Sequence, residues 1–237
     1  SMRVMTWNTA GNATGAETIA QTAVAMEADI VALPETAEGV GEEVAVLMRE
    51  LGHPMWVHNE AYNEDVVDGP QAWQTTLLVS PRMGDYSVIE ASNDGTTMLP
   101  TAVAMPVSGE GPIIVAAHAV APQARYMDAW RSDLRWLADQ CVDDDVIMVG
   151  DFNATVDHMS ALGAGGNDLG WCRDAATETG NGAAGTWPAS LPTIVGAPID
   201  HVLVSDTWDV SGSIVVTNVD DAGSDHRPLV VQLEPAG

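Results

Sequence analysis

Short apolar, β-branched runs recur along the whole chain, and several of them stop at a polar residue. The run at residues 145–149 ends at the stretch Gly150-Asp151-Phe152-Asn153, and the last run follows Ser224-Asp225-His226-Arg227-Pro228. Runs this short and this rich in Val and Ile are typical of buried strands rather than helices. Strands that end in polar residues are expected to bring carboxylate, amide and imidazole groups together along one rim of a sheet.

The remaining patterns place helices between these strands. Apolar residues at helical spacing predict helices at residues 15–28, 41–51 and 124–141, with a short one at 157–162. The stretch 163–198, rich in Gly, Asn and Pro, is expected to be a loop that forms a substrate-facing rim. Strands are predicted at 3–8, 29–33, 55–58, 75–80, 86–90, 99–106, 112–118, 145–149, 199–204, 213–217 and 229–233.

The order of elements predicts an α/β fold with a single domain over residues 2–235. A strand-rich stretch with a helix appears in each half, and no low-complexity linker divides the chain. Two sheets packed face to face, with helices outside each, would bury the apolar faces of all these elements. The expected architecture is therefore a sandwich of two packed, mostly antiparallel sheets with outer helices.

The charge of the chain is unusual because lysine is absent and the formal net charge is −26. A uniform negative field repels polyanions at long range, so a long nucleic acid is disfavoured as a substrate. Two interpretations stand side by side. The acidity reflects a salt-rich or extracellular host setting, or it serves a site that attracts divalent cations and rejects long nucleic acids.

The cysteines and the hydropathy of the chain indicate which kinds of metal site, cross-link and membrane segment to expect. The two cysteines, Cys141 and Cys172, form no CxxC motif, which disfavours a zinc site built from thiolates. Two buried free thiols are the expected state, and a disulfide is the alternative for an exported protein. No apolar run is long enough to cross a membrane. The abrupt start at Ser1-Met2 leaves open an extracytoplasmic domain trimmed from a membrane-anchored or exported protein, and we expect a monomer.

Polar residues at the ends of the early strands are candidates for a metal and phosphate site. Asn8 follows the first strand, where it is either a turn former or a ligand of a metal-bound water or phosphate oxygen. Glu35 follows the second strand, where it is either a solvent-exposed carboxylate or the principal Mg²⁺ ligand. His118 closes an apolar strand, as a buried core histidine or as a donor to phosphoryl oxygens.

The second half of the chain carries the stronger signals. Asp151 and Asn153, two residues apart, are expected on the same side of an extended segment, where they orient a water nucleophile and donate to a phosphoryl oxygen. Asp200 is either a strand cap or the carboxylate that holds a catalytic imidazole. His226 is expected as that imidazole, acting as general base or phosphate clamp, with Asp225 as a metal ligand or a supporting carboxylate.

A few further residues are weighed for substrate binding. Arg125 and Arg131 are the cations that follow His118 most closely, and either is a candidate to grip a substrate phosphate. Trp187 is either a packing residue or part of the pocket wall. His201, next to Asp200, is expected to point to the opposite face of its strand and to have a structural role.

In this order the motifs resemble those of the endonuclease/exonuclease/phosphatase superfamily, which includes DNase I-like nucleases, sphingomyelinases and inositol polyphosphate 5-phosphatases. The resemblance runs from the first strand to the last. It rests on Thr6-Trp7-Asn8, Leu33-Pro34-Glu35, Ala117-His118, Gly150-Asp151-Phe152-Asn153, Ile199-Asp200-His201 and Gly223-Ser224-Asp225-His226.

The resemblance implies a four-layer α/β/β/α sandwich that depends on Mg²⁺ or Mn²⁺. It assigns Asn8, Glu35 and Asp225 to the metal and phosphate region. Asp151 and Asn153 would position the water and the scissile phosphate. The remaining implied residues are a carboxylate–imidazole pair and a histidine on the opposite side of the phosphate, which are Asp200, His226 and His118.

The chain also departs from the family pattern. Pro34 stands where many members have Gln before the Glu. Nucleases of the DNase I type support their first histidine with an acidic residue, whereas the corresponding region here offers only Gln71, Gln74 and Thr75. This difference weakens a general-acid role for His118, and no basic DNA-binding loop is evident.

The leading hypothesis is therefore a metal-dependent phosphoesterase, most simply a phosphodiesterase that uses water in an in-line attack. Within this class, a nuclease and a lipid, inositol or small-molecule phosphoesterase remain open. The alternative from another class is a non-catalytic module that binds metal or phosphate on the same scaffold.

Overall fold

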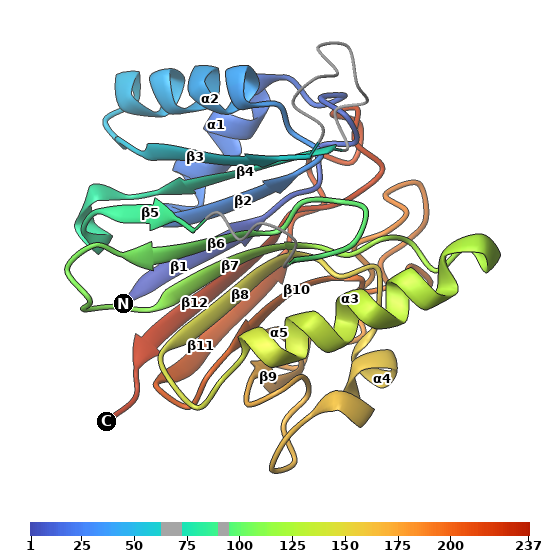
Figure 1. Ribbon diagram of the computed structural model, residues 1–237. Helices are drawn as coiled ribbons and strands as arrows, with labels where there is room; N and C mark the ends of the chain where they lie inside the picture. Colours follow the sequence, from blue (N-terminus) through green and yellow to red (C-terminus); the bar gives the residue numbers. More distant parts are fainter. Residues whose placement is uncertain (63–72, 90–94) are drawn as a thin grey trace.

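The computed structural model describes residues 1–62, 73–89 and 95–237, which form two six-stranded sheets stacked face to face (Figure 1). The first sheet has the order β11-β12-β1-β2-β4-β3, with β1 (Met2–Thr6), β2 (Ile30–Pro34), β3 (Trp56–Ala61), β4 (Gln74–Val79), β11 (Trp208–Val215) and β12 (Leu229–Pro235). The second has the order β5-β6-β7-β8-β10-β9, with β5 (Tyr86–Val88), β6 (Ala102–Pro106), β7 (Ile113–His118), β8 (Val146–Asp151), β9 (Arg173–Asp174) and β10 (Asp200–Val204).

Helices cover the outer face of each sheet and complete the four layers expected from the sequence (Figure 1). The first sheet carries α1 (Ala16–Ala25) and α2 (Glu38–Glu50), and the second carries α3 (Met127–Gln140). The remaining helical segments are short: α4 (Val156–Met159), α5 (Ala175–Glu178), and the 3₁₀ turns η2 (Pro81–Met83), η3 (Ala124–Tyr126) and η4 (Ser160–Leu162). In the described part of the chain, no helix combines the length and the apolar character needed to cross a bilayer.

Three apolar cores lie between these layers, and the strand patterns explain them. Val4 and Ile30 enter the core between the two sheets, whereas their neighbours Met5 and Val31 enter the core beneath α1 and α2. Successive residues of a strand point to opposite faces, so a strand covered on both sides has to be apolar throughout. The third core, between the second sheet and α3, contains residues such as Leu203.

Each sheet contains one parallel pair, β1 with β2 and β7 with β8, while its other pairs are antiparallel. Parallel neighbours end at the same edge, so Asn8 and Glu35 leave one sheet together and His118 and Asp151 leave the other. The antiparallel strand β10 begins where β8 ends, with Asp200 opposite Asp151. This topology gathers polar residues from distant parts of the sequence along one rim.

Some predicted elements differ from those observed. The segment 163–198, expected to be a loop, also contains β9 and α5. The strand expected at 213–217 begins earlier, at Trp208, and carries an irregularity between Val210 and Gly212. The strand expected at 86–90 is observed over Tyr86–Val88, and Glu90 lies outside the described residues.

The expectation of two free thiols is wrong, because Cys141 and Cys172 form a disulfide with their Cα atoms 5.8 Å apart. Cys141 ends α3, and Cys172 lies in the loop before β9. The backbone N–H of Trp171 donates to the carbonyl oxygen of Cys141 (2.9 Å), which brings the two segments together. The sequence separation of 31 residues gives no local signal for this approach.

Replacing Cys141 and Cys172 by serine is expected to lower the free energy of unfolding by about 3–4 kcal/mol, because closing a loop of this length restricts the unfolded chain. Urea unfolding of the variant and of the oxidised and reduced wild type measures the effect. Equal stability of the oxidised wild type and the variant would contradict the pairing.

Candidate active site

The first two polar residues of the rim leave β1 and β2. The side-chain amide of Asn8 donates to Asp151 Oδ2 (2.9 Å), and its Oδ1 accepts from the backbone N–H of Ala10 (2.9 Å). Asn8 therefore links the two sheets through Asp151. Glu35 follows β2 with a left-handed backbone (φ 55°), and its side chain is about a quarter exposed.

Asp151 lies at the end of β8, where Gly150 allows two strands to approach closely. A Cβ atom at Gly150 would lie only 2.0 Å from the carbonyl oxygen of Ala117 in β7. The carboxylate of Asp151 is buried, and its Oδ1 accepts from the backbone N–H of Asn153 (2.9 Å). Any larger residue at position 150 would push β8 away from β7 and displace Asp151 from the rim.

Asn153 does not continue the strand, which corrects the expectation that it lies beside Asp151 on an extended segment. Its backbone is left-handed (φ 47°), so the alternation of side chains in a strand no longer applies. The side-chain amide donates to the carbonyl oxygen of Ala119 (2.8 Å), and the indole N–H of Trp130 donates to the carbonyl oxygen of Asn153 (3.0 Å). The turn is thus held between β7 and α3.

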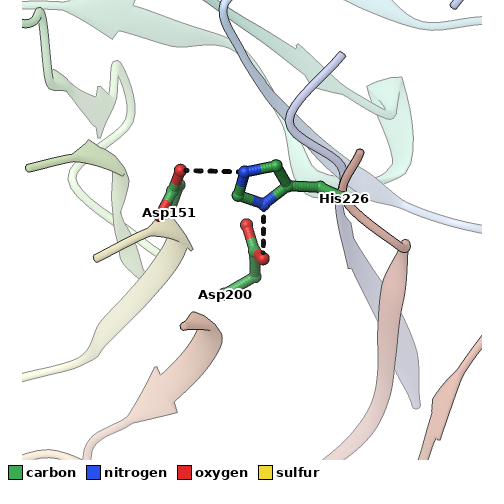
Figure 2. Close-up of side chains that lie close together, drawn as sticks. All are labelled: Asp151, Asp200 and His226. Atoms are coloured by element: carbon green, nitrogen blue, oxygen red, sulfur yellow. Dashed lines mark hydrogen bonds and ion pairs between the residues drawn. The ribbon is translucent and has the colours of Figure 1, made fainter. Parts of the chain in front are cut away.

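His226 lies between two carboxylates from neighbouring strands of the second sheet (Figure 2). Its Nδ1 is 2.8 Å from Asp200 Oδ2, and its Nε2 is 3.8 Å from Asp151 Oδ2. All three residues are buried. His226 itself comes from the segment before β12 in the first sheet, so this cluster joins both sheets.

The backbone around His226 is held by the two residues that follow β1, Trp7 and Asn8. The Ser224 hydroxyl donates to the carbonyl oxygen of Asn8 (2.5 Å) and accepts from the backbone N–H of His226 (3.0 Å). The indole N–H of Trp7 donates to the carbonyl oxygen of His226 (2.9 Å). Sequence reasoning gave Ser224 and Trp7 no role of their own, although both stand within the motifs.

The carboxylates dominate the electrostatics of the cluster. Burial alone would lower the pKa of His226, but the charges of Asp200 and Asp151 overcome it and raise this pKa to about 10. Burial and the neighbouring charge of Asp200 raise the pKa of Asp151, against the opposing effect of His226. With its pKa raised to about 10, His226 is an imidazolium at neutral pH, and both of its ring nitrogens are donors.

His118 differs from His226 because, among the described residues, no carboxylate lies within hydrogen-bonding distance of it. Its Nε2 is 3.8 Å from both Glu35 Oε1 and Asp151 Oδ2, and its Nδ1 is buried without a hydrogen-bond partner. Burial lowers the pKa of His118 and keeps the ring neutral. In this region Gln74 and Thr75 bond elsewhere, and Gln71 lies outside the described residues.

Asp225 and Trp187 meet at the outer edge of the cluster. The indole N–H of Trp187 donates to Asp225 Oδ2 (2.9 Å), and the Trp187 side chain is 40% exposed. The Trp187 side chain is thus partly covered and partly in solvent beside an acidic residue. Asp225 directly precedes His226, so Trp187 adjoins the candidate site.

Arg227 was missed as a functional residue by the sequence reasoning. Its guanidinium is buried and forms a paired interaction with Asp220 (2.7 and 2.8 Å). The same group donates to the carbonyl oxygens of Gly185, Ala189 and Leu191. Arg227 thereby links the loop that carries Trp187 to the segment that carries His226. Its position directly after His226 is the sequence feature that could have indicated this role.

The two arginines proposed as phosphate ligands interact with neighbouring residues of their own segment. Arg125 is exposed and lies over the ring of Tyr126, 4.5 Å from its centroid. Arg131 is exposed and pairs with Asp128 at 3.6 Å, one turn away on α3. Neither makes a hydrogen bond or ion pair with the candidate site among the described residues.

His201 lies on the opposite face of β10 from Asp200, as alternation in a strand requires. Its Nδ1 is 2.8 Å from Asp174 Oδ1, and its Nε2 is 2.7 Å from the carbonyl oxygen of Ala154. Burial would lower the pKa of His201, but Asp174 overcomes it and raises this pKa, while His201 lowers the pKa of Asp174 against the effect of burial. This buried pair supports the strand and the turn that present Asp200 and Asn153.

Asp174→Asn is expected to destabilise the protein by about 3–5 kcal/mol near pH 5, with a smaller loss near pH 8. The raised pKa of His201 stabilises the fold fully below its ordinary value of 6.5, and this stabilisation disappears as pH rises through the raised value. Urea unfolding at both pH values checks the prediction. The exposed control Asp209→Asn should show no such dependence, and an equal loss for Asp174→Asn at both pH values would contradict it.

The described rim thus combines buried carboxylates, a protonated imidazole and amide groups at the end of an α/β/β/α sandwich. The family model for the endonuclease/exonuclease/phosphatase family matches residues 5–226. The chain therefore belongs to this family, and it has the phosphoesterase fold of the family with a buried Asp/His cluster. No curated protein sequence matches the chain significantly.

Solved structures show the same fold at low sequence identity. An endonuclease/exonuclease/phosphatase from Beutenbergia cavernae is 21% identical, with a TM-score of 0.73 over 100% of this chain and 72% of that chain. A family protein from Leptotrichia buccalis is 13% identical, with a TM-score of 0.74 over 99% and 100%. The human Nocturnin catalytic domain with bound sulfate is 16% identical, with a TM-score of 0.68 over 99% and 93%.

Proposed function

We propose that the protein is a metal-dependent phosphoesterase that hydrolyses a phosphodiester by in-line attack of water. The observation that carries this proposal is the position of His226, hydrogen-bonded to Asp200 on one side and facing Asp151 on the other. The Nε2–H of this buried imidazolium makes no hydrogen bond among the described residues, so it is suited to donate to an anionic phosphoryl oxygen. Family membership supports the same reaction class.

The residues present fit a hard divalent cation. Asp151 and Asp200 are buried, and the charges of Asp225 and Asp200 act on Glu35 nearby. Burial, the largest cause, together with these charges raises the pKa of Glu35, against the opposing effects of Asn8 and His226. The buried Asp200 Oδ1 has no hydrogen-bond partner in the described part of the chain. Oxygen donors in excess over cations are the environment that Mg²⁺ and Mn²⁺ require.

Two sets of residues are candidates to hold this ion. Asp151, Asp200 and His226 offer ligand atoms that all lie within 4.8 Å of one another. In that set, however, Asp200 and His226 are already bonded to each other. We therefore favour Glu35 with Asn8 and Asp225, the set expected from the sequence. When bound, the ion would neutralise charge that develops on the phosphoryl oxygens.

The side chains of the chain would perform the remaining steps. His226 donates from Nε2 to a phosphoryl oxygen, and Asp200 holds its ring and stabilises the imidazolium. Its raised pKa favours this clamp over the alternative of a general base. Asp151 orients the attacking water and accepts its proton, for which a raised pKa is suited. Asn153 and neutral His118 add donors around the phosphate.

His226→Ala, Asp151→Ala and Asn153→Ala are each expected to lower kcat/KM by about 10²–10⁴-fold, because each removes a group that acts on the transition state. Hydrolysis of bis-p-nitrophenyl phosphate with Mn²⁺ gives the rates. Melting temperatures show whether the fold is kept, and Asp209→Ala on β11 serves as the exposed acidic control. Wild-type rates in all three variants would reject the site, and metal binding without any turnover would favour the non-catalytic module.

Two further variants show which of the two candidate sets of residues holds the metal ion. Glu35→Gln is expected to raise the Mn²⁺ concentration for half-maximal activity at least tenfold, because it removes a charged ligand. Asp200→Asn should lower kcat with little change in that concentration, because it disturbs the imidazole. Activity titrated with Mn²⁺ distinguishes them, and the reverse result would assign the ion to Asp151, Asp200 and His226.

The substrate class can be determined with a panel of plasmid DNA, short oligonucleotides, sphingomyelin and inositol phosphates. We expect plasmid DNA to be a poor substrate at physiological salt, because a net charge of −26 repels a polyanion.

A further inference from the structure

One loop beside the candidate site displays large apolar side chains to solvent. The loop at residues 187–195, named here the apolar loop, exposes Trp187 (40%), Leu191 (44%), Ile194 (86%) and Val195 (62%). Among the described residues, no other stretch as short exposes as many large apolar side chains. Single exposed apolar residues are ordinary, whereas a cluster of this kind marks an interaction surface.

The same loop lacks the charge that covers the rest of the molecule. No Asp, Glu or Arg occurs between Glu178 and Asp200, which is the longest charge-free interval of the sequence. Elsewhere the acidic residues are spread along the whole chain. The apolar loop itself thus carries no charged side chain, and the acidic residue that contacts it is Asp225, through Trp187.

The backbone that carries these exposed side chains is held by hydrogen bonds. The backbone N–H of Gly185 donates to the carbonyl oxygen of Thr193 (2.7 Å), and Thr186 and Ala197 pair across the base of the loop (3.0 Å). From inside, the buried guanidinium of Arg227 binds the carbonyl oxygens of Gly185, Ala189 and Leu191. This scaffold presents Ile194 and Val195 outward at a fixed position.

The apolar loop also lies next to the candidate active site. The indole N–H of Trp187 donates to Asp225 Oδ2 (2.9 Å), and Asp225 directly precedes His226. A group bound against the loop would therefore lie close to the phosphoesterase cluster. An apolar support next to a phosphate site fits a substrate with an apolar body and a phosphoester head.

We propose that the apolar loop docks on an electrically neutral lipid surface, so that a phosphoester headgroup reaches His226. A loop without charged side chains is compatible with a zwitterionic surface, whereas the net charge of −26 repels anionic surfaces and polyanions. Exposed tryptophan and aliphatic side chains are the groups that enter the boundary between headgroups and acyl chains. The headgroup part of this proposal rests on the proposed function, but the docking part stands on the loop alone.

Cosedimentation with phosphatidylcholine vesicles tests the docking. Ile194→Ser and Val195→Ser are each expected to weaken binding about tenfold, because each removes an aliphatic side chain from the contact. Val107→Ser is the matched control, since Val107 is 67% exposed and precedes β7, at the end of that strand opposite His118. Melting temperatures confirm that the three variants fold alike.

The outcomes separate docking from catalysis. Binding of the wild type that falls in Ile194→Ser and Val195→Ser but not in Val107→Ser supports the proposal. No binding to the vesicles, or equal losses in all three variants, overturns it. Dimers that disappear in Ile194→Ser, seen by sedimentation, would assign the loop to a second copy and also overturn it. Hydrolysis of soluble bis-p-nitrophenyl phosphate by the wild type tests the proposed function independently of any vesicle.

Discussion

The candidate site depends on placing one positive charge among several buried negative ones. His226 is hydrogen-bonded to Asp200 and faces Asp151, and all three are removed from water. Buried carboxylates are costly unless they are paired, so the imidazole becomes the stable cation of the cluster. This balance explains why the pKa of His226 rises to about 10, and the excess of oxygen donors explains why the site is suited to a divalent ion.

The same interactions hold the two sheets together at their rim. Asn8 from the first sheet donates to Asp151 in the second, and Ser224 joins the segment before β12 to the end of β1. The polar groups of the site therefore also fix the relative position of the layers, and an apolar core fills the space between the sheets. Behind the rim, the buried pair of His201 and Asp174 plays a similar part for β10.

Much of this arrangement was predictable because the strands are covered on both faces. A strand such as β8 or β10 has to be apolar throughout, which makes it visible as a short run, and the polar residue at its end then marks the rim. Asp151, Asp200 and His226 were found in this way. The turn at Asn153 was misjudged because its left-handed backbone is imposed by contacts with Ala119 and Trp130, which come from elsewhere in the fold.

By itself, the sequence determined the alternation of strands and helices, the polar residues at strand ends, and the negative charge of the surface, since these follow from local pattern and composition. Only the tertiary structure decided which of these groups meet. It paired Cys141 with Cys172, gave Arg125 and Arg131 partners on their own segment, and used Arg227 to fix the loop that bears Trp187. These outcomes depend on contacts between distant segments, and such contacts arise when the layers pack and leave no trace in the local order of residues.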